Sequence, residues 1–186
     1  MNKAGSNRRI SEKAFLNARN CPRWGWETLN GKMQSPLSLE EEYLFYEGNV
    51  IGQMAKRQFP TGIEITSKDP DEALEETSRA LRTNPPSVLF EPAFAYRQFL
   101  TRVDTLVPVG TGFSLIEVKA ATEKSVQKAE GEEYLKDLAY TVWVCQKPGF
   151  RFLRRNCGFY PALIDSGKAS ARYLRRSIAQ DWSIGF

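Results

Sequence analysis

No histidine occurs among the 186 residues of this chain. Its absence excludes catalytic triads built on histidine, zinc sites with histidine ligands and histidine general bases. The three cysteines, Cys21, Cys145 and Cys157, are an odd and widely spaced set, which favours reduced thiols over a disulfide framework. Internal repeats and apolar runs long enough to span a bilayer are also lacking. The sequence therefore predicts neither a repeat protein nor a transmembrane protein.

The N-terminal segment has no apolar stretch of the kind found in signal peptides, so the expected location is cytoplasmic. With 41% hydrophobic residues, the chain is long enough to bury one core and short for two. We therefore expect a tail over residues 1–10 and a single domain over residues 11–186.

The distribution of charge is uneven along the chain. Residues 1–32 carry 7 Lys or Arg against 2 Asp or Glu, and residues 147–176 carry 8 against 1. Residues 33–146 carry 11 against 18. Basic ends around an acidic centre are expected if phosphates are held at the rim and divalent cations in the middle. Ordinary solvated surface charge is the alternative interpretation.

The stretch from residue 101 to residue 122 is typical of a β-hairpin. Two runs rich in β-branched residues, 102–109 and 113–121, are joined by Gly110-Thr111-Gly112. Asp104 on the first run, and Glu117 and Lys119 on the second, interrupt otherwise apolar strands. Because buried charges are rare unless they are paired or bound to a metal, these three are candidates for chemistry.

The register of this hairpin decides whether the three charges meet. Glu117 and Lys119 share a face of their strand, whereas Val118 points to the other face. A two-residue loop at Gly110-Thr111 places Asp104 opposite Glu117, whereas a three-residue loop pairs Asp104 with Val118. Directly opposed carboxylates repel each other, so the tight loop favours a cation between them.

The clearest helix covers residues 38–58, where Ser38 and Glu41 form a capping box. Glu47 lies on its apolar face, and Gly48 and Gly52 leave an adjoining strip where another element or a ligand backbone could approach. The remaining expected elements are helices over residues 11–20, 69–84, 132–146 and 169–180 and strands over residues 63–66, 87–96 and 150–164.

Several basic and aromatic residues are candidates for contacts with nucleic acid. Arg23 and Trp24 combine a cation with a large ring, which suits stacking on bases or anchoring to the core. The candidates for phosphate contacts, with surface solvation as the alternative, are Arg151, Arg154, Arg155, Arg172, Arg175 and Arg176.

The sequence has an acidic residue on a helix, then an aspartate on a strand, and then Glu-x-Lys about a dozen residues after that aspartate. This order resembles the PD-(D/E)XK nuclease superfamily. The segments RVDTL, LIEVKAAT and DLAYTVWV are most similar to its RecB-type branch. The likeness is greatest to CRISPR spacer-acquisition exonucleases and to uncharacterised bacterial domains with a Cys-Pro-Arg motif, here Cys21-Pro22-Arg23-Trp24, and a helix like FYEGNVIGQMAKRQFP. The resemblance covers residues 11 to 150.

The resemblance implies an α/β fold with a restriction-endonuclease-like core, in which a central mixed β-sheet is flanked by helices. It also implies that Asp104 and Glu117 bind Mg²⁺ or Mn²⁺, helped by the Val118 carbonyl and by Glu47. Lys119 would orient or activate water and steady the phosphate. Hard cations prefer such oxygen ligands, and a bound cation offsets phosphate charge without histidine.

The chain departs from the branch on the helix after Glu-x-Lys. Thr141 and Cys145 replace the usual Gln and Tyr, and Tyr140 is a partial substitute for contact with DNA. With only three cysteines, the chain is not expected to bind an iron–sulfur cluster.

The leading hypothesis is a metal-dependent deoxyribonuclease, most specifically an exonuclease in DNA repair or defence. An alternative is a catalytically weak or inactive nucleic-acid-binding module that keeps the fold, with protein partners left open. A third is a structural ion pair between Asp104 and Lys119.

Overall fold

In the computed structural model, the described residues are 8–31, 36, 38–120 and 130–150, together with strands at 152–160, 164–165, 168–169 and 174–177. Side chains are described at 8–31, 36, 38–118 and 136–150. Within these ranges the fold is mixed α/β, and none of the helices is both long and apolar enough to cross a membrane. The five helices of this part are α1 (Glu12–Asn20), α2 (Pro22–Leu29), α3 (Leu39–Lys56), α4 (Pro70–Ala80) and α6 (Glu130–Gln146).

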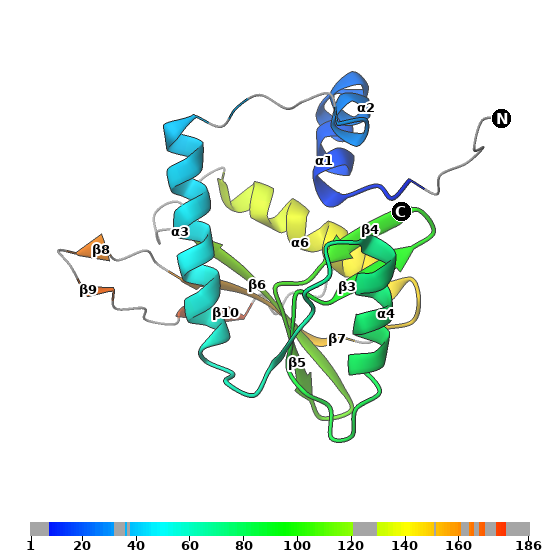
Figure 1. Cartoon of the computed structure of the whole chain (residues 1–186), viewed down its shortest axis with the longest axis vertical. Helices are drawn as coiled ribbons and strands as arrows, with labels where there is room; N and C mark the ends of the chain where they lie inside the picture. The colour runs from blue at the N-terminus through cyan, green and yellow to red at the C-terminus, as the bar shows by residue number, and fades with distance from the viewer. Residues whose placement is uncertain are drawn as a thin grey trace.

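A mixed sheet in the order β1-β2-β5-β6-β7-β10 forms the centre of the molecule (Figure 1). The pairs β1–β2 and β6–β7 are parallel, and the other neighbours are antiparallel. A separate hairpin joins β3 to β4, and a short one joins β8 to β9. The strands are β1 (Ile63–Glu64), β2 (Leu89–Phe90), β3 (Ala93–Tyr96), β4 (Phe99–Arg102), β5 (Thr105–Val109), β6 (Gly112–Ala120), β7 (Phe152–Tyr160), β8 (Ile164–Asp165), β9 (Lys168–Ala169) and β10 (Leu174–Ser177).

Helices cover both faces of this sheet. Leu89, Leu106 and Leu115 are fully buried and belong to one core with residues of α4 and α6. Their burial stabilises the fold by roughly 1.5–3 kcal/mol for each side chain. Val118, three residues after Leu115, packs instead against Ile51 and Ala55 of α3. Because side chains alternate along a strand, α3 lies on the opposite face from that core.

Local signals fix the start of α3 and α4. The Ser38 hydroxyl accepts from the Glu41 N–H, and the Glu41 carboxylate accepts from the Ser38 N–H, so the predicted capping box is confirmed. The Asp69 carboxylate caps α4 by accepting from the N–H groups of Asp71 and Glu72. The helix predicted over residues 11–20 is also confirmed, as α1.

The Cys-Pro-Arg-Trp motif lies on a helix that was not expected from the sequence. Cys21 is the N-cap of α2. Gly25 allows α1 and α2 to pack closely, because a Cβ at this position would overlap Ala18. Ile10, at the end of the predicted tail, forms a β-bridge with Phe99 and is therefore part of the folded body.

Two other sequence predictions need correction. The single strand predicted over residues 87–96 is two strands, β2 and β3, because the chain bends at Glu91-Pro92 and β3 leaves the main sheet to pair with β4. The helix predicted over residues 169–180 is not formed, since residues 174–177 are the strand β10, paired with β7. Pairing with a sheet edge overrides local helix propensity there.

Candidate metal and nucleic-acid site

The β5–β6 hairpin has the register that brings Asp104 level with Glu117. Val109 pairs with Gly112, so the loop contains two residues, and Gly110 adopts the positive φ of 54° that such a tight turn requires. The ladder ends at Thr105 opposite Ile116. The next residue along each strand is Asp104 on one side and Glu117 on the other, so the structure has the two-residue loop, one of the two loops that the sequence left open.

Asp104 joins three strands at the end of this ladder. One carboxylate oxygen, Oδ2, accepts a hydrogen bond from the backbone N–H of Val118 at 2.6 Å. Its carbonyl oxygen accepts from the N–H of Glu91 at 3.2 Å. A charged acceptor makes the first of these bonds stronger than an ordinary amide hydrogen bond. The side chain of Asp104 is thus held beside β6, and its backbone beside the end of β2.

A cavity of about 140 Å³ opens beside Asp104. Helix α3 forms one wall, and the ends of β2, β5 and β6 form the other. The lining residues are Gly48, Asn49, Gly52, Gln53, Ala55, Lys56, Glu91, Asp104, Thr105 and Val118. Two carboxylates, one ammonium group and two side-chain amides therefore meet in one small space.

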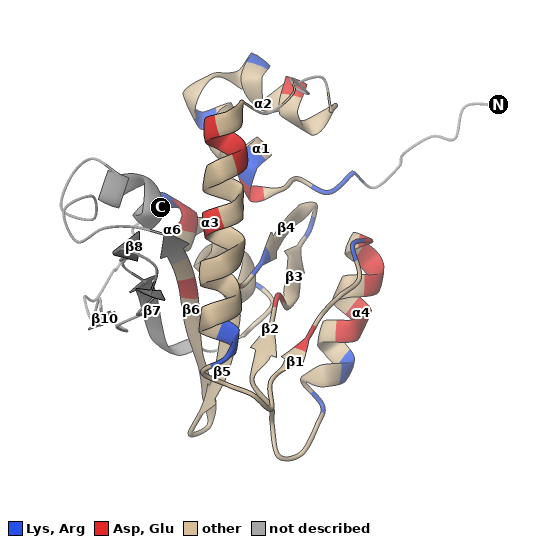
Figure 2. Ribbon diagram, turned by 60° about the vertical axis from the view of Figure 1, so that its left-hand side comes forward, with Lys and Arg blue, Asp and Glu red and all other residues tan. Residues whose placement is uncertain are grey.

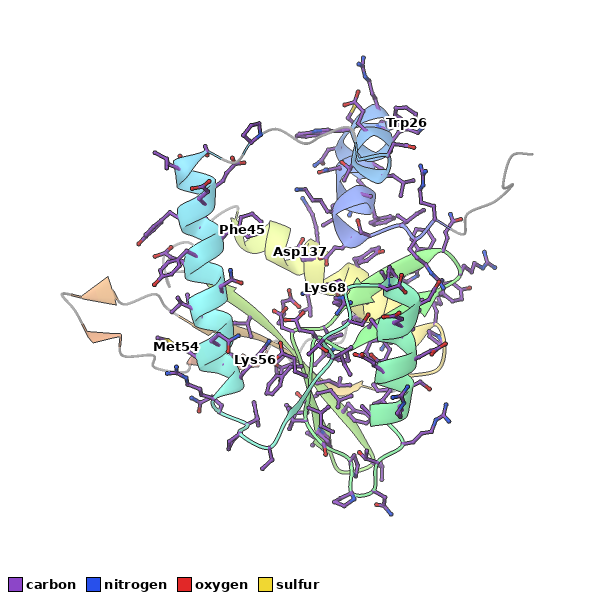
Figure 3. The ribbon with its side chains drawn as sticks, viewed as in Figure 1. Trp26, Phe45, Met54, Lys56, Lys68 and Asp137 are labelled. Atoms are coloured by element: carbon purple, nitrogen blue, oxygen red, sulfur yellow. The ribbon has the colours of Figure 1, made fainter. Side chains whose placement is uncertain are left out.

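Lys56 is the cation of this cavity, and Figure 3 shows it on the opposite side of α3 from Met54. Its Nζ lies 2.6 Å from Oε1 of Glu64 and 3.9 Å from Oε1 of Glu91. Only the first distance is that of a hydrogen bond. The Lys56 side chain is 18% exposed and also lies over the ring of Phe90. Lys56 is therefore held by a hydrogen-bonded ion pair with Glu64, whereas its ion pair with Glu91 is longer than a hydrogen bond.

Glu91 has an uncommon backbone conformation at the cavity wall. Its φ is 56°, in the left-handed region that residues with a side chain seldom adopt. The carbonyl of Glu91 accepts from Nη1 of Arg102 at 3.4 Å, and its N–H donates to Asp104. Such conformations persist where the surrounding structure holds them. Here they turn the side chain of Glu91 toward the same cavity as Asp104.

Glu117 is buried, with 7% of its surface exposed. It follows Leu115 by two residues, so alternation places it on the face opposite α3. Glu47 lies on α3 itself and hydrogen-bonds to the hydroxyl of Tyr43, which raises the pKa of Tyr43. Among the described residues no three His, Cys, Asp or Glu side chains form a group that could hold a metal ion. Glu47 is bonded to Tyr43 and is not among the residues that line the cavity beside Asp104, so its role as a metal ligand stays a prediction.

Two glycines on α3 leave the cavity wall bare. A Cβ added at Gly48 or at Gly52 would meet no atom within 4 Å, although both residues line the cavity. Glycine inside a helix costs about 1 kcal/mol relative to alanine, and no close internal packing compensates for it here. The predicted open strip along this helix is confirmed.

The helix after Glu-x-Lys faces the core rather than a ligand. Tyr140 is 3% exposed, and its hydroxyl is shared between the carbonyl oxygens of Ile10 and Leu100. Thr141 is 1% exposed and hydrogen-bonds to the hydroxyl of Thr101 at 3.0 Å. The prediction that Tyr140 contacts nucleic acid is therefore corrected: desolvation, followed by the charge of Glu12, raises its pKa and keeps the hydroxyl protonated.

The other predicted contacts with nucleic acid have mixed positions. Arg23 is exposed and pairs with Glu27 at 2.9 Å, and Trp24 is 43% exposed on α2. Trp26, labelled in Figure 3, is also exposed, so this helix presents rings to solvent. The side chains of Lys119, Arg151, Arg154, Arg155, Arg172, Arg175 and Arg176 lie outside the described residues.

Acidic residues gather at the N-terminal end of α3 and along α4 in Figure 2. Neither group lines the cavity, where the carboxylates are those of Asp104 and Glu91. Of the side chains that the structure describes, the charged ones lining the cavity are therefore those of Asp104, Glu91 and Lys56.

Sequence reasoning missed Lys56, Glu64 and Glu91. Glu91 interrupts an apolar strand just as Asp104 does, so the same rule would have selected it. Lys56 follows Gly52 by four residues and therefore shares its helix face. Its partners could not be predicted, because Glu64 and Glu91 reach it only through the pairing of β1 with β2.

Comparison with known protein families, with curated proteins and with solved structures gives no match to this chain.

Proposed function

We propose that the protein is a metal-dependent nuclease acting on DNA, with Asp104, Glu117 and Lys119 as its catalytic residues. The observation that carries the proposal is the register of the β5–β6 hairpin, which ends with Asp104 and Glu117 at adjacent positions. The order of α3, the antiparallel strands β2, β5 and β6, helix α6 and the parallel strand β7 supports a restriction-endonuclease-like core.

The carboxylates present suit a hard divalent cation. Mg²⁺ is commonly bound through one or two carboxylates, with waters and substrate phosphates completing its shell, so a cage of three protein ligands is not required. Asp104 is level with Glu117 at the end of the β5–β6 ladder and lines the cavity together with Glu91, whereas alternation places the Glu117 side chain on the face opposite α3. A bound Mg²⁺ or Mn²⁺ would supply positive charge at the phosphate and ease the deprotonation of water.

Each of the three proposed catalytic residues then has a distinct role. The hydrogen bond from Val118 orients the Asp104 carboxylate, and Glu117 is kept in a largely water-free position by its burial. Lys119 stands two residues after Glu117 on β6, and alternation places it on the same face. In this position its ammonium group would contact the scissile phosphate and stabilise the charge that develops there.

The test is degradation of labelled DNA by the full chain in Mg²⁺ or Mn²⁺. Asp104→Asn, Glu117→Gln and Lys119→Met each remove a charge with little change in shape, and each should lower the rate by about 100-fold or more. Thermal unfolding of every variant separates lost chemistry from lost structure.

A matched control is Glu75→Gln, which removes one negative charge from the exposed side of α4. It should cut DNA as the unsubstituted chain does. The assignment is wrong if cutting survives Glu117→Gln and Lys119→Met, or if the purified chain shows no metal-dependent cutting of DNA.

A non-catalytic nucleic-acid-binding module is the second candidate. It is favoured by Thr141, which is buried against Thr101 at the position where a RecB-type nuclease carries the Gln that contacts its substrate. Such a module would bind DNA with a strong dependence on salt and leave it intact in Mn²⁺. Anisotropy titrations at several salt concentrations, followed by gel analysis of the same DNA, distinguish the two candidates.

A further inference from the structure

We propose that one strip of α2, made of Arg23, Trp26 and Asn30, binds single-stranded DNA, with a base stacked on Trp26 and phosphates held by Arg23 and Arg8. This inference rests on the proposed function for the kind of nucleic acid, and it names the form of DNA that the protein binds. Trp26 and Arg8 are additional to the contacts predicted from the sequence, which on this helix were Arg23 and Trp24.

Helical spacing places these residues in one strip. Positions three and four apart are neighbours on the surface of a helix, so Arg23, Trp26 and Asn30 follow one another along α2. The Asn30 amide group donates to the Trp26 carbonyl at 2.6 Å, and the Asn30 side-chain oxygen accepts from Nη1 of Arg8. Trp26 therefore lies between two arginines along the strip.

This strip is open to solvent. Trp26 is 53% exposed, and the Arg23 side chain is 84% exposed. Another side of α2 packs on α1, where Gly25 lies against Ala18. Figure 3 shows Trp26 at the end of the molecule formed by these two helices. A large ring is thus presented to solvent by a packed helix pair, the kind of surface on which an unpaired base can stack.

The sign of the surrounding charge favours nucleic acid at Trp26. Residues 8–31 carry 5 Lys or Arg against 2 Asp or Glu, which attracts a chain of phosphates. Phe45 on α3 is 63% exposed but has the opposite surroundings, because residues 39–47 carry 4 Glu and no Lys or Arg. Of these two exposed aromatic surfaces, that of α2 is complementary in charge to DNA.

Arg23 can exchange its present partner for a phosphate. Its Nε lies 2.9 Å from Oε1 of Glu27, four residues along the same exposed helix. Surface ion pairs of this kind contribute little to stability, so replacing Glu27 by a phosphate of DNA costs little.

Stacking on Trp26 selects single strands over duplexes. Bases inside a duplex are already stacked on their neighbours, and taking one out costs free energy. The bases of a single strand meet the ring without that cost.

The test is a titration of labelled single-stranded and duplex DNA with the full chain, in EDTA so that metal-dependent cutting is prevented, followed by fluorescence anisotropy. Trp26→Ala should weaken binding of single strands by about fivefold or more, and Trp26→Phe, which keeps a ring, should have a smaller effect. Arg8→Gln and Arg23→Gln should each weaken binding and lower its dependence on salt. Glu27→Gln should tighten binding, because Arg23 loses a competing partner.

Phe45→Ala is the matched control, since it removes an exposed ring that glutamates surround. It should leave the affinity for single strands unchanged. Thermal unfolding shows whether each variant is folded, and Arg8→Gln with Arg23→Gln tests the proposal again if Trp26→Ala is not.

The outcomes separate this inference from the nuclease assignment. Equal affinity for single strands in Trp26→Ala and the unsubstituted chain overturns the inference, even if DNA is cut in Mg²⁺. A loss of affinity in Trp26→Ala that is larger for single strands than for duplexes supports it, even if the chain cuts no DNA and the nuclease assignment fails. A loss of equal size for both forms overturns the selection of single strands.

Discussion

The carboxylate of Asp104 accepts a hydrogen bond of 2.6 Å from the backbone N–H of Val118, which ties the residue before β5 to β6. This bond makes Asp104 structural as well as a candidate ligand. Any substitution there therefore has two consequences that must be measured separately.

Asp104→Ala should lower the free energy of unfolding by about 2 kcal/mol, because the Val118 N–H loses a charged acceptor. Asp104→Asn offers an amide oxygen to the same N–H and should cost less than half as much. Urea unfolding of both variants checks the difference. If they are equally destabilised, the carboxylate of Asp104 does not hold β6 through this bond.

The hydroxyls of Thr101 and Thr141 form a buried hydrogen bond of 3.0 Å between β4 and α6. Thr141→Val removes one partner and should destabilise the protein by about 1–3 kcal/mol, since the other hydroxyl stays buried. The double variant Thr101→Val/Thr141→Val should cost less than the sum of the single ones, and unfolding of all four proteins gives this coupling. Additive costs would show that the two hydroxyls act independently.

Tyr140 predicts a loss of stability at alkaline pH. Burial raises its pKa above the usual value of 10.0, so the folded state holds the phenol proton more tightly than the unfolded state. The resulting stability is fully present below pH 10.0 and is lost as the pH rises above it. Tyr140→Phe should lower the free energy of unfolding by about 1 kcal/mol at neutral pH, because the two buried carbonyl oxygens lose their donor. The variant should also lose less stability than the unsubstituted chain between neutral and strongly alkaline pH. Denaturant unfolding at a series of pH values measures both effects.

Cys145 should keep some dependence of stability on alkaline pH in the Tyr140→Phe variant. Burial also raises the pKa of its thiol above the usual value of 9.0, so Cys145 contributes an alkaline loss of the same sign. Cys145→Ala in the Tyr140→Phe background should remove most of the remaining slope. An unchanged slope in Tyr140→Phe would place the alkaline transition elsewhere.

Glycine to alanine substitutions should have opposite signs at two positions. Gly25→Ala places a methyl group where Ala18 already lies and should destabilise the α1–α2 pair by about 1–3 kcal/mol. Gly48→Ala meets no atom within 4 Å and should stabilise α3 by up to about 1 kcal/mol. Circular dichroism during thermal unfolding compares them, and a destabilising Gly48→Ala would mean that α3 is not a regular helix there.

Several local features were determined by the sequence alone. The capping box at Ser38 was predicted correctly, and the two-residue loop at Gly110 is one of the two loops that the hairpin sequence allowed. Each depends on residues within a few positions of one another, so short-range hydrogen bonds and backbone sterics decide them. The alternation that sets Glu117 apart from Val118 is local in the same sense.

Only the tertiary structure decided which charges share a cavity. Glu64 and Glu91 are brought to Lys56 by the parallel pairing of β1 with β2, between segments more than twenty residues apart. The sequence also made Glu47 a candidate metal ligand beside Asp104 and Glu117. In the structure, α3 packs on the Val118 face of the sheet, and Glu47 is bonded to Tyr43. The sequence of the hairpin brought Asp104 and Glu117 to one level, whereas packing between distant elements decided that Glu91 and Lys56 are the neighbours of Asp104.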